Sequence, residues 1–144
     1  MTRILMIIIL CAGITGCGNT KAKKESDTET QVKTDVVEVI YFHNKQRCAS
    51  CVAIEKNAKE LVETEYEEQV KSGKVIFRTV DITENERLVD RYEISFSSLI
   101  VVDWSKDGKE KVENMTEFAF AKARKAPGEF KSALSDQINT MLKN

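Results

Sequence analysis

The sequence predicts an α/β domain over residues 36–144, in which strands alternate with helices and build one mixed four-stranded sheet. Short runs of β-branched and aromatic residues alternate with longer stretches whose apolar residues recur at helical spacing. A turn containing glycine joins the last two strand-like runs and predicts a hairpin. A Cys-x-x-Cys pair, Cys48 and Cys51, falls between the first strand and the first helix.

The first half of the domain predicts a strand–helix–strand unit. Residues 36–42, VVEVIYF, are almost continuously apolar, as in a strand covered on both faces, and we expect Glu38, their one charge, near a strand end. An apolar stripe then predicts a helix that stops at Ser72-Gly73. Residues 74–82, KVIFRTVDI, form the second strand, parallel to the first after a right-handed crossover. The stripe consists of Cys51, Ile54, Ala58, Leu61, Val62 and Tyr66.

A second, shorter helix is predicted after these two strands. Residues 83–94, TENERLVDRYEI, contain Thr83 three residues before Glu86, which is the spacing of a capping box. Asp81, just before this helix at the end of the second strand, is assigned a structural role.

The last part of the domain predicts a hairpin and a closing helix. Residues 98–104, SLIVVDW, and 109–114, KEKVEN, are expected to be strands joined by a turn at Asp107-Gly108. Trp104, at the end of the third strand, is assigned a structural role. The closing amphipathic helix has apolar residues at helical spacing, namely Phe130, Leu134, Ile138, Met141 and Leu142.

Residues 1–16 have the pattern of a secretory signal peptide. One basic residue, Arg3, precedes an apolar run to about Ile14, and small residues follow. The run is too short to span a bilayer as a helix. Residues 14–17, ITGC, resemble the bacterial lipobox, which implies cleavage before Cys17, a diacylglycerol thioether on its sulfur and usually an acyl chain on the new N-terminus. The alternative is an ordinary cleaved signal peptide followed by an incidental cysteine.

Residues 17–35 are expected to form the lipidated cysteine and a disordered tether, because charged and hydroxyl residues dominate and little apolar surface can be buried. The lipid anchor would hold the domain on the extracytoplasmic, periplasmic side of an envelope membrane. Cys11 would leave with the signal peptide, so Cys48 and Cys51 would be the free thiols. Loss of Arg3 changes the net charge from −1 to −2, which gives no reason to expect a nucleic-acid partner.

The domain resembles the thioredoxin fold over essentially its whole length. The segments YFHNKQRCASC, AIEKNAKEL and VDITENERLVDRYEISFSSLIVVD also resemble the thioredoxin-like lipoproteins known as the arsenic-locus-associated nitrophenyl-compound nitroreductase subunit family. The resemblance implies a three-layer α/β/α fold with a central mixed four-stranded sheet and Cys-x-x-Cys at the start of the first helix. We expect no cofactor.

The placement of the two cysteines predicts different roles for them. Cys48, at the helix start, faces unpaired N–H groups and the positive end of the helix dipole, which favour its thiolate, so we expect it to be the exposed nucleophile. Cys51, one turn later on the apolar stripe, is expected to be the buried resolving thiol. Arg47 and Lys45 either support the thiolate by charge or are simply solvated.

The proton of Cys51 needs an acceptor that the thioredoxin pattern does not supply here. The buried carboxylate that is usual late in the first strand is replaced, because the matching positions are Tyr41 and Phe42. His43 and Glu38 are the candidates for this task.

Two further positions depart from the thioredoxin pattern. Arg47 stands where a tryptophan normally precedes the first cysteine. Ser97 stands at the position of the usual cis-proline, and Pro127 is the only proline in the chain. A cis peptide before a residue other than proline costs about 3–4 kcal/mol, so we expect a rebuilt loop at Ser97.

Three uses of the cysteine pair stay open. The favoured use is that of an envelope thiol–disulfide oxidoreductase, in which Cys48 and Cys51 reduce or exchange the disulfides of envelope proteins and a membrane-embedded thiol donor supplies electrons. The second is a soft-metal or arsenite site of Cys48, Cys51 and His43, although zinc normally requires a fourth ligand. The third is a structural disulfide in a binding module without catalysis. Haem attachment is excluded because Val52 follows Cys51.

Overall fold

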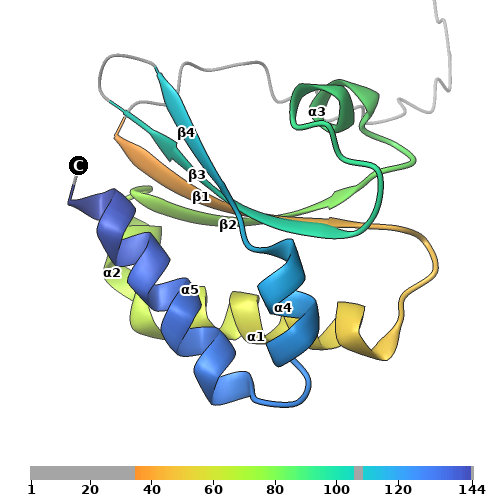
Figure 1. Ribbon diagram of the computed structural model, residues 1–144. Coiled ribbons are helices and arrows are strands. Elements are labelled where there is room, and N and C mark those ends of the chain that lie inside the picture. The colour runs from red at the N-terminus through yellow and green to blue at the C-terminus, as the bar shows by residue number, and fades with distance from the viewer. Residues whose placement is uncertain (1–34, 106–108, 144) are drawn as a thin grey trace, which may run out of the picture.

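Strands and helices alternate through the first half of the domain, and a hairpin and two helices complete it (Figure 1). The computed structural model describes residues 35–105 and 109–143. In chain order the elements are β1 (Val36–His43), α1 (Ala49–Glu65), α2 (Glu67–Lys71), β2 (Val75–Asp81), α3 (Glu86–Arg91), β3 (Ser98–Trp104), β4 (Glu110–Asn114), α4 (Thr116–Lys122) and α5 (Pro127–Leu142).

The four strands form one mixed sheet in the order β2-β1-β3-β4. β1 and β2 are parallel, β3 is antiparallel to β1, and β4 is antiparallel to β3. The two central strands are buried along almost their whole length, which explains why both are nearly continuous apolar runs in the sequence. The pairing of Phe42 with Ser98 brings the end of β1 beside the start of β3.

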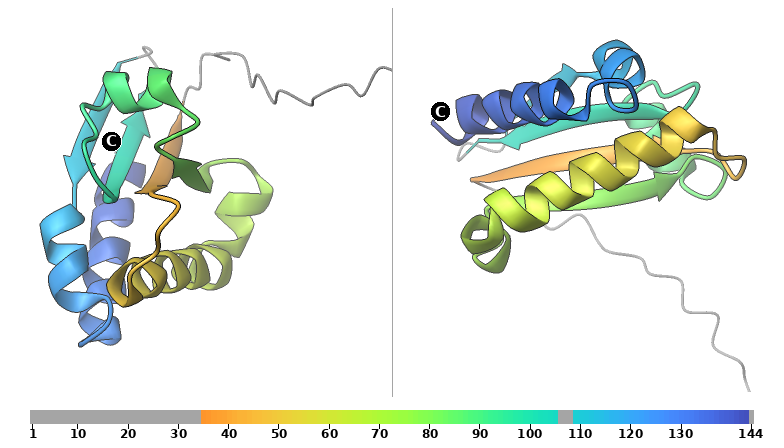
Figure 2. Two further views of the ribbon diagram at one scale, coloured as in Figure 1. Left: turned by 90° about the vertical axis from the view of Figure 1, so that its right-hand side faces the viewer. Right: turned by 90° about the horizontal axis from the view of Figure 1, so that it is seen from below.

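Helices cover both faces of the sheet and make three layers. In Figures 1 and 2, α1, α4 and α5 lie on one face, and α3 lies on the other. Because strand side chains alternate between faces, Val39 and Tyr41 of β1 join the core under α1 and α5, whereas Ile40 and Phe42 join the smaller core under α3. The predicted α/β fold, with its mixed four-stranded sheet and its dithiol at the start of the first helix, is confirmed.

The helices differ from the predicted pattern at two places. The predicted helix up to Ser72-Gly73 is divided, since α1 ends at Glu65 and the short α2 continues from residue 67. Ser72 caps α2, and Gly73 has a φ of 74°, a backbone conformation that favours glycine. The helix α4 was not predicted, because seven residues give too little periodicity to distinguish a helix from a loop.

The expected cap at Thr83 is wrong. The Thr83 N–H and hydroxyl both donate to Asp81 Oδ1, at 2.8 and 2.7 Å, and Asn85 holds the N-cap position of α3 without a side-chain hydrogen bond. These hydrogen bonds lower the pKa of Asp81. The Thr83 side chain is therefore engaged in the turn after β2 and does not cap α3.

Glu38 is the third residue of β1, near a strand end as expected, but its side chain does not reach the solvent there. Glu38 is fully buried in β1, where its carboxylate pairs with Arg78 Nε at 3.0 Å and accepts a hydrogen bond from Trp104 Nε1 at 3.3 Å. A charge inside an apolar strand is tolerated when a partner on the neighbouring strand compensates it.

Several predictions lie outside the described residues. They are the signal peptide, the lipidation at Cys17, the tether as far as residue 34 and the turn at Asp107-Gly108. Over the part of the chain that the structure describes, none of the helices has both the length and the apolar character needed to cross a membrane.

Candidate dithiol site

The two cysteines lie at the first turn of α1, where the loop after β1 enters the helix. Cys48 is the N-cap residue, with extended backbone angles of φ −78° and ψ 162°, and its Sγ accepts a hydrogen bond from the Cys51 N–H at 3.0 Å. The pair forms a disulfide with a Cα–Cα distance of 4.9 Å, which is within the usual range. The expected position of Cys-x-x-Cys at the helix start is thus confirmed.

The environments of the two sulfur-bearing residues differ sharply. Cys48 is exposed, whereas Cys51 is only 5% exposed and packs in the core with Ile54 and Ala58. After reduction, Cys48 Sγ would remain beside the free N–H groups of the first turn, which favour a thiolate. An accessible thiol beside a buried one is the arrangement that a two-step disulfide exchange needs.

Arg47 and Lys45 are both held by carboxylates. Arg47 forms an ion pair with Glu55, which lies about two turns into α1, and its guanidinium carbon lies 5.8 Å from the centre of the Tyr41 ring. Lys45 is largely exposed, and its Nζ is 3.6 Å from Glu84. Arg47 therefore remains next to the dithiol with its charge partly balanced by Glu55, while Lys45 is directed to another loop.

Ser97 occupies the loop that leads into β3, and it is buried. No peptide bond among residues 35–105 and 109–143 is cis, so the Phe96–Ser97 bond is trans. Side chains alternate along the chain here, and Leu99 pairs with Tyr41, so Ser97 lies on the Tyr41 face of the sheet. The loop is thus built on a trans peptide, as the energy of a cis bond at serine requires.

Tyr41 is the buried side chain that joins these parts of the site. Its ring is fully buried, in the same core cluster as Cys51. Burial raises the pKa of the Tyr41 phenol, and the nearby Arg47 charge and Ser97 hydroxyl oppose that rise. In the sequence, Tyr41 stands out only as a replacement for the usual carboxylate. The order of residues along the chain does not predict which side chains surround its hydroxyl.

The two candidate acceptors for the Cys51 proton lie in different places. His43 ends β1 with its ring centre 6.3 Å from that of Tyr41, and its Nδ1 is 3.3 Å from the Asn44 carbonyl oxygen. Glu38 lies on the opposite face of the sheet from Cys51, and its carboxylate forms an ion pair with Arg78. It is therefore not placed to take the Cys51 proton.

The alternative metal site would require Cys48, Cys51 and His43 to lie together. Within the described ranges, no group of three or more His, Cys, Asp or Glu side chains is arranged to hold a metal ion. The structure therefore does not gather His43 with the two sulfurs into one ligand set.

An apolar hollow opens beside the loop that contains Ser97. Phe96 is 60% exposed at its edge, and the volume of the hollow is about 580 Å³. The helix α4 forms its other side and is fastened to β3, because Thr116 Oγ1 accepts a hydrogen bond from the Leu99 N–H at 3.0 Å. This surface was missed from the sequence because α4 itself was not predicted. Its lining residues are Phe96, Asn114, Thr116, Glu117 and Phe120.

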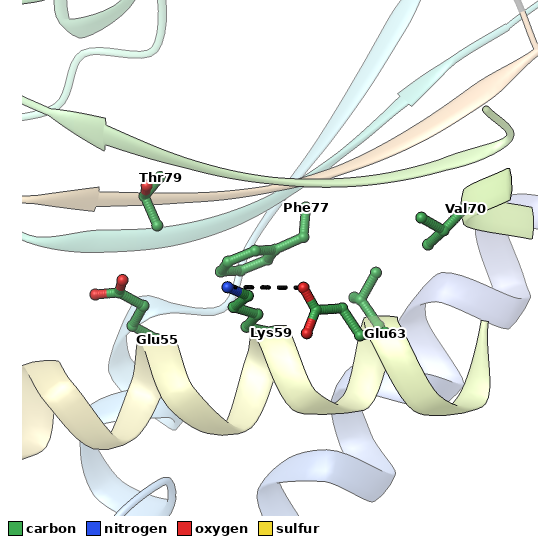
Figure 3. A pocket seen from close by; sticks show the side chains of 7 residues that line it. Glu55, Lys59, Glu63, Val70, Phe77 and Thr79 are labelled. Atoms are coloured by element: carbon green, nitrogen blue, oxygen red, sulfur yellow. Dashed lines mark ion pairs between the residues drawn. The ribbon is translucent and has the colours of Figure 1, made fainter. Parts of the chain in front are cut away.

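A second hollow, of about 320 Å³, lies between α1, α2 and the edge strand β2 (Figure 3). Lys59 projects into it beneath Phe77 and faces Glu63, with an Nζ–Oε1 distance of 3.7 Å. Neither cysteine lines it, and paired charges of this kind are typical of a solvated surface. Neither cysteine lines the Phe96 hollow either, but Phe96 directly precedes Ser97 in the loop that leads into β3. We therefore place the candidate site at the dithiol and treat the Phe96 hollow as an adjoining surface.

The fold and the site together define an α/β domain with a mixed four-stranded sheet that carries a disulfide-forming Cys-x-x-Cys pair at the start of its first helix. No protein-family model matches the chain, and no curated protein matches it. Among solved structures, it is similar to the Trx4 domain of ERdj5, with 15% identity and a TM-score of 0.44 over 69% of this chain and 81% of that chain. It is also similar to one titled "Structure of a malarial protein", with 18% identity and a TM-score of 0.39 over 61% of this chain and 92% of that chain. At these values, similarity carries no conclusion about activity or substrate.

Proposed function

We propose that the protein is a thiol–disulfide oxidoreductase of the cell envelope that reduces or exchanges disulfides in other envelope proteins. The observation that carries the proposal is the pairing of an exposed Cys48, at the N-cap of α1, with a buried Cys51 one turn later. A purely structural disulfide needs neither the exposed sulfur nor the helix N-terminus beside it.

The reaction follows from this geometry. The Cys48 thiolate attacks one sulfur of a substrate disulfide, and the other substrate sulfur leaves as a thiolate that takes up a proton. The Cys51 thiol then loses its proton and attacks Cys48 Sγ, which releases the second substrate thiol. Two electrons pass from the dithiol to the substrate, and the domain is left with the Cys48–Cys51 disulfide.

The Phe96 hollow is suited to hold the polypeptide around the substrate disulfide. An exposed aromatic ring beside an apolar depression favours binding of an apolar side chain, and Glu117 on the same lining favours a basic neighbour. The position of Phe96 directly before Ser97 places this surface at the dithiol end of the sheet.

The location and the electron source are part of the proposal. The lipobox-like residues 14–17 support a lipid anchor at Cys17, and the polar residues that follow support a tether. In an oxidising compartment a reductant needs electrons from elsewhere, so a membrane-embedded thiol donor is the partner that would regenerate the dithiol.

Trapping of mixed disulfides tests the function directly. Cys51→Ser should accumulate covalent adducts with envelope proteins through Cys48, whereas Cys48→Ser should form few, because the remaining thiol is buried. The double variant is the control, and insulin reduction by the native protein is measured in parallel. Equal trapping by both single variants, or none by either together with no insulin reduction, would refute the assignment. Tight binding of Zn(II) or As(III) without turnover would favour the metal alternative instead.

A further inference from the structure

The hydroxyl of Tyr41 is a buried polar group that the disulfide form leaves without a hydrogen bond. The residue is 0% exposed, and no donor or acceptor within the described part of the chain completes a hydrogen bond of good geometry with its oxygen. Buried hydroxyls are normally paired, and leaving one unpaired costs stability. A fold that retains such a group indicates that it has a partner in another state of the site.

The surroundings of Tyr41 restrict where that partner can be. Arg47 lies over the ring at 5.8 Å, and Ser97 is near enough for its hydroxyl to affect the phenol. Arg47 directly precedes Cys48, and Tyr41 shares its core cluster with Cys51. The phenol is thus enclosed by the groups that surround the dithiol, on the face of the sheet that α1 covers.

The neighbours that could accept or donate are already engaged or poorly aligned. The Arg47 guanidinium pairs with the Glu55 carboxylate and approaches the phenol without forming an aligned hydrogen bond. The Ser97 hydroxyl approaches the phenol without forming an aligned hydrogen bond. The hydrogen-bond acceptor strength of the two cysteine sulfurs differs between the redox states, because a disulfide sulfur is a weak acceptor whereas a thiolate is a strong one.

We propose that Tyr41 is a positioning residue for the resolving thiol, and that its hydroxyl donates a hydrogen bond to Cys51 Sγ once the disulfide is reduced. This inference rests on the proposed thiol–disulfide function. Because burial raises the pKa of the phenol, Tyr41 stays protonated and acts as a donor rather than as an anion. The hydrogen bond stabilises the Cys51 thiolate at the moment when it must attack Cys48 Sγ.

A consequence follows for the balance between the two redox forms. The hydroxyl is unpaired in the disulfide form and paired in the dithiol form, so Tyr41 favours reduction. Tyr41→Phe keeps the ring and removes only the hydroxyl. The variant should therefore shift the equilibrium with a glutathione redox buffer about tenfold towards the disulfide, a change of about 30 mV.

The test measures this equilibrium by thiol counting and the thermal unfolding midpoint of each redox form. Tyr41→Phe should lower the midpoint of the reduced protein and leave that of the oxidised protein equal or higher. The matched control is Tyr66→Phe, another buried tyrosine, whose hydroxyl lies 2.8 Å from Ser135 Oγ. The control should lower both midpoints and leave the glutathione equilibrium unchanged.

The outcomes separate this inference from the proposed function. An equilibrium of Tyr41→Phe within twofold of the native value would overturn the inference, whether or not the native protein reduces disulfides. Equal lowering of both midpoints would also overturn it, because a merely structural hydroxyl would act on both forms. A tenfold shift in a protein that reduces no protein disulfide would support the hydrogen bond and refute the function instead.

Discussion

Glu38 and Arg78 form an ion pair across two neighbouring strands, with Arg78 Nε 3.0 Å from Glu38 Oε1. The carboxylate is fully buried in β1, and it also accepts the 3.3 Å hydrogen bond from Trp104 Nε1 of β3. One buried charge thus connects three adjacent strands on the face of the sheet opposite the dithiol. The pair explains how a glutamate can lie inside an otherwise apolar strand.

Removal of the positive partner should destabilise the domain. We expect Arg78→Met to lower the free energy of unfolding by about 3 kcal/mol, because the Glu38 carboxylate stays buried without its counter-charge. The double variant Glu38→Met with Arg78→Met should recover most of the loss. Urea unfolding measures both, and Lys59→Met, which breaks an exposed pair with Glu63, is the control with an expected cost below about 0.5 kcal/mol. A double variant as unstable as the single one would contradict this account.

The Phe96 hollow should affect protein substrates more than small ones. Phe96→Ala removes an exposed ring from the loop that leads into β3, and we expect KM for a reducible protein such as insulin to rise about threefold to tenfold. The rate with a small aromatic disulfide should change less than twofold. Val52→Ala, at another exposed apolar residue, is the comparison. An equal loss of activity with both substrates would show that Phe96 contributes to catalysis or to folding rather than to the binding of protein substrates.

Ser97 should separate the redox and metal alternatives. A proline at this position would cover the two sulfurs and remove an N–H group, so we expect Ser97→Pro to weaken any binding of Zn(II) or As(III) by the reduced protein. The same change should raise the turnover of disulfide reduction. Metal titration with thiol counting, beside an insulin assay, measures both effects. Negligible metal binding by both proteins would leave redox chemistry alone, whereas tight binding by the native protein without turnover would reverse the ranking.

The stability of the domain should fall at high pH through Tyr92. Burial of Tyr92 beside Phe42 and the nearby Glu110 carboxylate raise its pKa from 10.0 to about 12. Between these values the unfolded chain has lost the proton while the folded protein keeps it, so the contribution is complete below pH 10 and is lost as the pH rises towards 12. We expect about 1–2 kcal/mol, less than the full shift implies, because the ring is only partly buried.

Unfolding in urea from pH 8 to pH 11.5 measures this effect. Tyr92→Phe removes the titrating group, so its stability should decline less steeply than that of the native protein above pH 10. Parallel curves for the two proteins over the whole range would contradict the assignment to Tyr92.

The anchor depends on Cys17. We expect Cys17→Ser to appear in the soluble fraction or to accumulate as an uncleaved precursor, because no thiol remains for the diacylglycerol thioether. Fractionation and the mass of the mature N-terminus measure this, and Cys11→Ser is the control that should mature normally. Normal membrane retention of the Cys17 variant would show that the lipobox resemblance is misleading.

The sequence by itself determined the sheet and the place of the dithiol. Runs such as 36–42 and 98–104 are long and apolar enough that only buried strands account for them, and they are β1 and β3. The stripe from Cys51 to Tyr66 has strong helical periodicity, so the first helix and its buried face were predictable. The position of Cys48 followed directly, because a helix that begins after it makes it the N-cap.

Only the tertiary structure decided which side chains surround the dithiol. Tyr41 belongs to β1, Arg47 to the loop before α1, and Ser97 to the loop before β3. The register between β1 and β3 brings Ser97 close to Tyr41. The same holds for Glu38 and Arg78, because the β1–β2 register brings the buried carboxylate to its positive partner. A pattern along the chain reports the burial of each residue, whereas contacts between distant residues arise from pairing and packing that the pattern does not encode.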